Sequence, residues 1–399
     1  MTYSEELYGI WLSQRFEAGS PAPGKLLSRL RTPSAVYRAE KETLYSLGIS
    51  SQEARRLSAK DLEKSLRIAE ACAKKGIRVI TYGDREYPLQ FLQTETPPAV
   101  IYCRGKLPET DGELFISAVG TRKCSDTGRQ NAHRLCFDLA SAGAVVVSGM
   151  ARGIDSACHA GALDGGGKTV AVLGTGCDVI YPPENSYLYG SIIENGAVIS
   201  EYPPGFEPLA ENFPVRNRLI AALGAVTVIV EAGVGSGALI TADRAAAMGR
   251  TVYAVPGAIN TPQSKGCNLL LKRGAALCTG AEDILSGYEL TFPDKIRIEN
   301  IISKKYFVGD YRERQDGRPE ELQKAFESGN DLSDTKLSRA SELEGDERTL
   351  YETLLKNGIM APEELSRTGI SMESAVYRLT LLEIKGYVTA LPGGKYAAK

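Results

Sequence analysis

Residues 212–233 read NFPVRNRLIAALGAVTVIVEAG, and this stretch decides the fold class. Leu219, Ile220 and Leu223 recur at the spacing of one helical face, whereas Val226–Val230 is a continuous apolar run. A short apolar run directly after a helix is typical of a buried strand in a parallel sheet. The stretch therefore predicts one helix–strand unit of an α/β protein.

The same alternation extends from residue 114 to about residue 285. Six segments predict strands, at residues 114–120, 144–149, 168–173, 197–202, 225–231 and 251–257, with helical segments between them. Several of these strands are apolar on both faces, as expected when helices cover both sides of a parallel sheet. We therefore expect an α/β fold with a Rossmann-like, doubly wound, mostly parallel core.

The regions before and after this core predict separate domains. Residues 1–75 are expected to be helical, and LYSLGISSQEARRL at residues 44–57 is typical of a helix-hairpin-helix, in which a glycine brings backbone N–H groups close to a phosphate. The alternative is a small helical packing domain, because any two helices need a turn. Residues 76–287 would hold the core with short lead-in strands.

The C-terminal third divides into two parts. Residues 288–345 are charged and glycine-punctuated, which predicts a linker or a partly disordered insert. Residues 346–399 are expected to form three helices and a hairpin, which is the pattern of a winged helix.

Composition excludes several classes of protein. The net charge is −2, so any surface that binds nucleic acid must be local. The first residues, MTYSEELYGIWL, do not resemble a signal peptide, and no apolar run is long enough to span a membrane. The eight cysteines form no CxxC pair and are expected to be reduced thiols in the core. The two histidines, His133 and His159, are expected to be hydrogen-bonded structural residues.

The loops after the predicted strands are rich in glycine and hydroxyl residues. Ligands of an open parallel sheet bind beyond the carboxyl ends of its strands, so these loops are expected to converge on one site. They also contain the cations Arg122, Lys123 and Arg152. Together they predict a phosphate-binding rim. Its loop residues are Gly120, Ser148, Gly149, Gly174, Gly235, Ser236, Gly237 and Thr241.

Two arginines of the opening stretch add to this rim. The helix is expected to begin near Pro214 or Val215, because proline is tolerated in a first turn. Arg216 and Arg218 would then lie beside a helix end that already carries partial positive charge, which predicts that an anion fills the site.

Phe213 lies just before the predicted helix start, and Asn217 separates the two arginines. An exposed aromatic ring beside arginines is the combination that binds single-stranded nucleic acid. The alternative is that Phe213 is a buried packing residue.

Known nucleotide motifs and catalytic sets are not found. The loop at residues 120–128 lacks G-x-G-x-x-G, and the chain has no Walker A sequence. Asp155, Asp178 and Glu231 stand at strand ends, but no nucleophile with a base and an orienting residue accompanies them. We expect no catalytic residue, no cofactor and no metal.

Several segments in order resemble one family. These are SGMARGIDSACHAGAL, TVAVLGTGCDVIYPPEN, ISEYPPGFEPLAENFPVRNRLIAAL, SGALITADRAAAMGR, VYAVPG and GCNLLLKRGA. They are similar to the DNA-processing protein A family (DprA, also called Smf), and the resemblance covers nearly the whole chain. It implies a sterile-alpha-motif-like (SAM-like) N-terminal domain, a Rossmann-like core and a C-terminal winged helix.

The resemblance also implies a function. Members are cytoplasmic bacterial proteins that bind single-stranded DNA, protect incoming DNA during natural transformation and help load the RecA recombinase. They are not enzymes, and they work as dimers through the Rossmann-like core. The family's DNA-binding positions correspond to Arg122, Phe213, Arg216 and Arg218, and Arg152 matches a further motif.

Two alternatives stay open at this point. A similar Rossmann variant occurs in phosphoribohydrolases, so a nucleotide-binding sensor or a phosphoribohydrolase-like enzyme is the second reading, although AGVGSGALIT lacks the catalytic glutamate of that signature. A winged-helix transcription regulator with a ligand-sensing core is the third.

Overall fold

The computed structural model describes residues 3–301 and 340, and further on residues 343–357, 360, 362–365, 370–385, 387–391 and 395–398. The chain divides into two compact units, residues 1–307 and residues 308–399.

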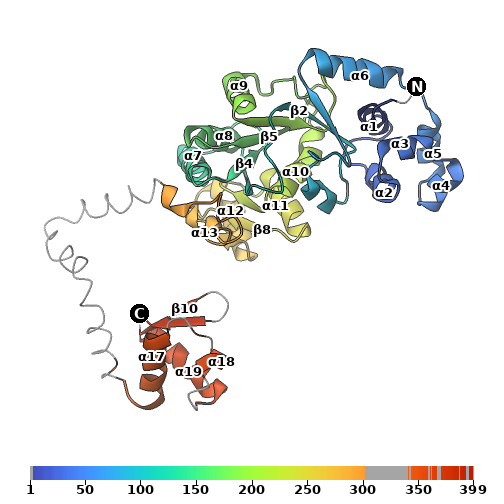
Figure 1. Cartoon of the computed structure of the whole chain (residues 1–399). Coiled ribbons are helices and arrows are strands. Elements are labelled where there is room, and N and C mark those ends of the chain that lie inside the picture. The colour runs from blue at the N-terminus through green and yellow to red at the C-terminus, as the bar shows by residue number, and fades with distance from the viewer. Residues whose placement is uncertain are drawn as a thin grey trace. The chain divides into compact units, whose positions relative to one another are not determined.

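A nine-stranded sheet forms the centre of the first unit (Figure 1). The strand order is β1-β2-β6-β5-β4-β3-β7-β8-β9. Strands β3 to β9 are mutually parallel. At one edge of the sheet, β2 pairs with β6 in the antiparallel direction, and β1 pairs with β2 in the antiparallel direction. The strands are β1 (Arg78–Thr81), β2 (Val100–Gly105), β3 (Phe115–Val119), β4 (Val145–Ser148), β5 (Thr169–Leu173), β6 (Gly196–Ser200), β7 (Val226–Ile229), β8 (Thr251–Ala254) and β9 (Ala276–Leu277).

The mostly parallel α/β core is therefore confirmed, with a strand at each of the six predicted segments. The lead-in strands are also present, as β1 and β2, but they belong to the same sheet as the core. The two-residue β9 was not predicted, because an apolar pattern cannot be recognised over so short a segment.

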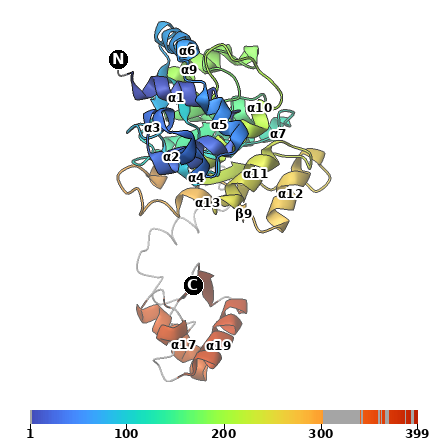
Figure 2. The same cartoon turned by 90° about the vertical axis from the view of Figure 1, so that its right-hand side faces the viewer.

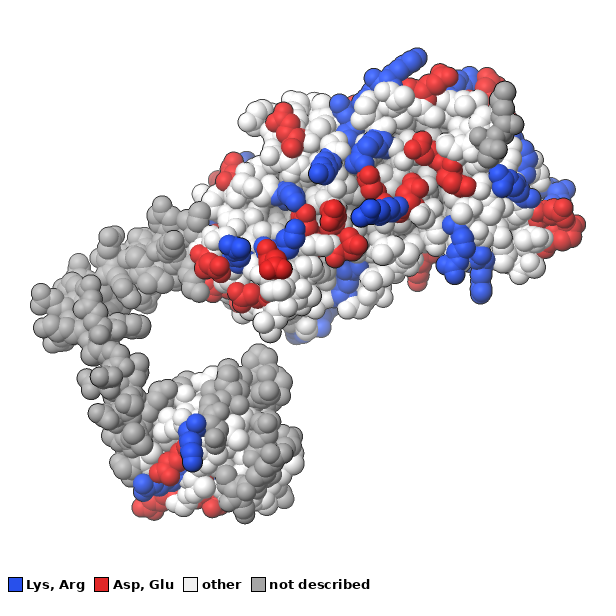
Figure 3. Space-filling view, in the orientation of Figure 1, with Lys and Arg blue, Asp and Glu red and all other residues white. Residues whose placement is uncertain are grey.

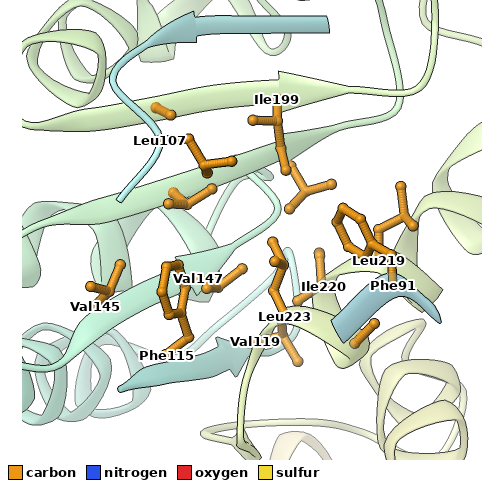
Figure 4. Packing of buried hydrophobic residues seen from close by; sticks show 14 of the residues in the cluster. Phe91, Leu107, Phe115, Val119, Val145, Val147, Ile199, Leu219, Ile220 and Leu223 are labelled. Carbon is orange, nitrogen blue, oxygen red and sulfur yellow. The ribbon is translucent and has the colours of Figure 1, made fainter. Parts of the chain in front are cut away.

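Helices cover both faces of the sheet. One face packs against α10 (Asn212–Leu223), α11 (Ala238–Ala247), α12 (Lys265–Lys272) and the short η1 (Leu89–Gln93). The other packs against α7 (Asp126–Ser141), α8 (Ile154–Asp164), α9 (Ser186–Glu194) and α13 (Glu282–Leu285). Successive residues of β3 alternate between the two cores, with Phe115 and Val119 in one and Ile116 in the other. Figure 4 shows Phe91, Leu219 and Leu223 packed with Phe115 and Val119 in the first core.

The chain reverses its winding direction between β3 and β7. After β3 it continues through α7 to β4 on one side, and after β7 it continues through α11 to β8 on the other. The loops that follow β3 and β7 therefore diverge, and a crevice at such a switch point is where open α/β sheets bind ligands.

Six helices precede the sheet and share a core with its first edge: α1 (Glu5–Ser13), α2 (Pro21–Leu30), α3 (Pro33–Arg38), α4 (Lys41–Ser46), α5 (Ser51–Ser58) and α6 (Glu63–Lys74). They group at the right-hand end of the unit in Figure 1 and face the viewer in Figure 2. Trp11 is fully buried among them, and Val100 and Tyr102 of β2 join the same cluster. The predicted hairpin is α4–α5, whose turn includes Gly48 at a φ of 76°.

The predicted linker begins with packed residues. Ile296 and Ile301 are buried in the core under α7 and α13, and η4 (Ile298–Asn300) lies between them. Residues 288–301 therefore extend the first unit, because spaced isoleucines bury apolar area despite the charged residues around them. Most of the remaining predicted linker lies outside the described residues.

The second unit contains α17 (Gly345–Asn357), α18 (Pro362–Leu365), α19 (Met372–Ile384) and the antiparallel pair β10 (Val388–Leu391) and β11 (Lys395–Ala398). Leu350, Tyr351 and Leu379 are buried in its core. Each predicted helix and the hairpin strands have a counterpart here. No helix among the described residues of either unit is long and apolar enough to cross a lipid bilayer.

The histidines and cysteines make the expected structural contacts. His159 is buried in α8, and its Nδ1 lies 2.7 Å from the Thr169 hydroxyl, which donates to the Val146 carbonyl. Thr169 therefore accepts from His159 Nδ1–H, and the Nε2 lone pair of His159 has no partner among the described residues. The half-exposed His133 pairs with Asp164 at 2.7 Å. All eight cysteines are free thiols.

We predict that Gly161→Ala destabilises the first unit. A Cβ at Gly161 would overlap the backbone of His133, where α7 crosses α8 closely. Overpacking of this kind costs about 1–3 kcal/mol in the free energy of unfolding, which urea titration would measure. Gly190→Ala is the matched control, since a Cβ on this α9 glycine meets nothing within 4 Å. This variant should raise the free energy of unfolding by about 0.5–1 kcal/mol. Equal stabilities of the two variants would contradict this packing.

We predict a second effect in acid. Burial lowers the pKa of His159 from 6.5 to about 3. The unfolded chain thus binds a proton below pH 6.5 that the folded chain refuses until about pH 3. Between these values His159 costs about 1.4 kcal/mol of stability per pH unit. His159→Asn should make the unfolding free energy of the first unit depend less on pH in this window and leave its pH dependence above pH 7 unchanged. If the variant and wild type show the same pH dependence at every pH, His159 does not have this role.

Candidate nucleic-acid interface

A hollow of about 400 Å³ lies at the switch point, beyond the carboxyl ends of β3, β4 and β7. We call it the switch-point hollow. It brings together these predicted residues: Gly120, Arg122, Lys123, Phe213, Arg216, Asn217, Ser236, Gly237 and Thr241. Arg152, Arg218, Ser148, Gly149, Gly174 and Gly235 are not part of its lining.

Phe213 is half-buried at the hollow, in the first turn of α10. The guanidinium carbon of Arg122 lies 4.9 Å from the ring centroid, and that of Arg216 lies 5.9 Å away. The Tyr181 ring lies 5.6 Å from it, at an interplanar angle of 38°. Phe213 is therefore neither fully exposed nor a core residue, and cations and a second aromatic ring hold its position.

Sequence reasoning missed Tyr181. It lies 32 positions before Phe213, and no local pattern connects the two. The only available signal was an aromatic residue at the start of the YPPEN segment that precedes α9.

The helix that contains Phe213 begins earlier than predicted. It starts at Asn212, so Arg216 and Arg218 lie beyond its first turn. The Asn212 side chain donates to the Gly174 carbonyl at 3.0 Å, which anchors this earlier start. Pro214 becomes the third helical residue, where its missing N–H still costs no helical hydrogen bond.

Arg216 is buried under the hollow. Its Nη1 donates to the Val172 carbonyl of β5 and, at 2.8 Å, to the Gly149 carbonyl after β4. Desolvation lowers the pKa of Arg216 to about 10, although nearby Asp155 opposes this shift. Burial raises the pKa of Asp155 in turn, opposed by Arg216 and by the backbone N–H groups of Gly120, Ala151 and Gly149. Arg216 therefore contributes positive potential to the hollow from below.

Arg218 has a different environment. Its guanidinium makes two bonds to the Glu201 carboxylate, at 2.7 and 2.9 Å, and donates to the Thr96 hydroxyl at 2.8 Å. The side chains of Arg218 and Glu201 are 8% and 11% exposed, so this is a buried ion pair. That Arg218 contacts a DNA phosphate stays a prediction. The contacts seen in the structure give Arg218 a structural role.

Arg122 and Lys123 are exposed on the loop after β3. Buried Glu231 holds this loop, because its carbonyl accepts the Thr121 N–H at 2.8 Å and its carboxylate accepts the Ser125 N–H at 3.0 Å. Ser125 then caps α7 through the Gly128 N–H at 2.9 Å. Glu231 thus has a structural role, because it holds the backbone of the loop from which Arg122 and Lys123 project.

The α11 side of the hollow is neutral and polar. The Ser236 hydroxyl accepts from the Ala238 N–H at 3.3 Å, and the Asn217 amide donates to the Gly237 carbonyl at 3.3 Å. Within the part of the chain that the structure describes, no three metal-ligating side chains come together. Basic and acidic residues are interspersed on the face of the first unit that Figure 3 shows.

Arg152 lies outside the hollow. It is exposed at the start of α8 and forms an ion pair with Glu184. It lines a second depression next to the hollow.

These features define a doubly wound α/β binding protein with an arginine-and-aromatic hollow at its switch point. The chain belongs to the DNA recombination-mediator protein A family, whose sequence model matches residues 78–289. The resemblance found in the sequence is thereby confirmed. The family is named for mediating DNA recombination.

Individual relatives agree with this assignment. Protein Smf of Escherichia coli (strain K12) is 32% identical over 355 residues, which is 88% of this chain and 85% of that protein. The DNA processing protein DprA of Streptococcus pneumoniae (strain ATCC BAA-255 / R6) is 42% identical over 205 residues, covering 51% of this chain and 71% of that protein.

Two solved structures are also similar. The X-ray structure of DNA processing protein A from Streptococcus pneumoniae has a TM-score of 0.61 at 31% identity, covering 72% of this chain and 98% of that chain. The structure of DNA processing protein A from Helicobacter pylori, described for its single-stranded DNA binding mode, has a TM-score of 0.49 at 30% identity and covers 54% of this chain and 96% of that chain.

We predict that the arginines differ in their effect on stability. Arg218→Ala leaves Glu201 buried without its partner and should lower the free energy of unfolding by about 3–5 kcal/mol. Arg122→Ala removes an exposed side chain that lies over the Phe213 ring, and should lower it by no more than about 1 kcal/mol. Urea unfolding of both variants would measure this difference, and an Arg218→Ala variant as stable as wild type would contradict a structural role.

Proposed function

We propose that this protein binds single-stranded DNA in the switch-point hollow and acts as a recombination mediator without catalysing a reaction. The observation that carries the proposal is Phe213, a half-buried ring flanked by Arg122 and Tyr181 at the mouth of a cationic hollow. One base would stack on Phe213, and the adjoining phosphates would contact Arg122 and Lys123. Arg216 would act through its charge beneath the ring.

A single strand fits this geometry better than a duplex. The Phe213 ring is reached from within a hollow of about 400 Å³, which suits one or two unstacked nucleotides. The bases of a duplex are stacked and cannot reach such a ring without being flipped out. Stacking on an aromatic face also tolerates every base, so we expect little sequence preference.

The remaining family properties are part of the same proposal. We expect protection of incoming DNA during natural transformation, loading of the RecA recombinase, a homodimer through the Rossmann-like core, and a cytoplasmic location. The second unit would act as a winged helix, and residues 1–75 as a SAM-like domain. Membership of a recombination-mediator family supports these roles.

The second candidate is a small nucleotide as the resident ligand, bound by a sensor or a phosphoribohydrolase-like enzyme. The size of the hollow favours it, since about 300–1,000 Å³ is usual for small-molecule sites. Hydrolysis is less well supported, because Asp155 is the single carboxylate in the described lining and it is held by Arg216 and backbone N–H groups. Release of free base from nucleoside monophosphates would favour the enzyme.

We predict separable effects of the ring and the cation on oligo-dT binding. Phe213→Ala should lose about 1–3 kcal/mol, or roughly 5- to 150-fold in affinity, with an unchanged salt slope. For about four neutralised phosphates, log affinity should fall against log salt with a slope near −2.8, and Arg122→Ala should reduce this slope by about 0.7. Fluorescence anisotropy at several salt concentrations would measure both.

Two variants serve as controls for this experiment. Phe213→Tyr keeps a stacking ring and should bind nearly as wild type. Ile259→Ala removes an exposed apolar side chain outside the hollow and should change nothing. A flat salt response in wild type, or full affinity in Phe213→Ala, would contradict the proposed site.

A further inference from the structure

A groove of about 910 Å³ adjoins the switch-point hollow. It runs between α7 and α9 along the length of α8, and we call it the α7–α9 groove. Arg122 and Lys123 line both depressions. The cations at the mouth of the hollow are therefore also the entrance to the groove, and one extended ligand can occupy both.

The floor of the groove is made of small residues. Gly153, Ser156, Ala157 and Ala160 of the α8 region lie there. Because these side chains are short, the walls on either side stand high above the floor. The result is a channel open to solvent, which suits a flexible chain better than a compact ligand.

Like the hollow, the groove is lined by cations and an aromatic residue. Exposed Arg129, in the first turn of α7, stands on one wall, and Arg152 lies at the start of α8. Tyr187 of α9 stands on the opposite wall with 85% of its surface exposed. Burial does not account for a large aromatic residue in this position, whereas base stacking would.

Tyr181 connects the two sites. Its ring packs on Phe213, which lines the hollow, and Glu184 and Tyr187, which follow Tyr181 closely in the chain, line the groove. Phe213, Tyr181 and Tyr187 thus place aromatic residues in the hollow, against its ring and in the groove.

We propose that the bound single strand continues from the hollow across Arg122 and Lys123 into the α7–α9 groove, where Arg129 and Arg152 contact its phosphates and Tyr187 stacks a further base. The inference rests on the proposed function. It adds a second DNA subsite and assigns Arg129 and Tyr187, which no motif in the sequence indicated.

Two carboxylates in the groove already have partners. Glu184 pairs with Arg152, and Asp164 pairs with His133. Both pairs are solvent-exposed, so they are weak and easily exchanged for a phosphate. Glu184 must therefore compete with the strand for Arg152, and its removal should strengthen binding.

The experiment compares a short oligo-dT of about 5 nucleotides with a long one of about 16, a range typical of single-strand sites. Anisotropy titrations use the full-length chain. Tyr187→Ala and Arg129→Ala should weaken binding of the long strand about 5-fold or more and leave the short strand unchanged. Glu184→Gln should tighten binding of the long strand alone. Arg244→Ala, an exposed cation on α11, is the matched control and should have no effect.

The outcomes separate the two proposals. If Phe213→Ala weakens the short strand but Tyr187→Ala, Arg129→Ala and Glu184→Gln all leave the long strand unchanged, the groove is not a subsite and the hollow remains the DNA site. If wild type binds neither length, the proposed function fails together with the groove. The substituted groove side chains are exposed, and a thermal unfolding curve for each variant checks that it folds.

Discussion

The candidate site depends on the buried guanidinium of Arg216. One side chain bonds to the carbonyls of Gly149 and Val172, which belong to neighbouring strand ends, and lies close to Asp155 at the start of α8. A buried charge is tolerated only when it is paired and hydrogen-bonded. This network holds the ends of β4 and β5, α8 and α10 in one arrangement. Phe213 lies three residues before Arg216 on α10, so the same arrangement positions its ring.

Cations at the site thus divide by burial. Arg216 and Arg218 are buried, and their charges already interact with carbonyls and with the carboxylates of Asp155 and Glu201. Substituting either arginine should therefore first lower the stability of the fold. Arg122 and Lys123 are exposed on a loop that Glu231 holds rigid, so they are available to a ligand without cost to the fold. A polyanion would meet a loop whose backbone is already held, so little backbone entropy remains to be lost on binding.

Much of the fold was predictable because it follows from local patterns. Apolar runs predicted strands at six segments, and the expected doubly wound arrangement is present as the diverging winding at β3 and β7. Residues 288–301 and β9 were not predicted, since isolated isoleucines and a two-residue strand leave no periodic signal. The hollow gathers Arg122, Lys123, Phe213 and Arg216 as expected, but Arg152 lies in the adjoining groove and Arg218 faces Glu201.

By itself, the sequence determined the class of fold, the loops that meet at the sheet's carboxyl edge, and the family. Each of these depends on residue type and spacing along the chain. Only the tertiary structure decided which arginines are buried and which are free, and that Tyr181 stands against Phe213. Those outcomes depend on partners distant in sequence, such as Glu201 for Arg218 and Val172 for Arg216, and whether a charge is paired or exposed is set by three-dimensional packing.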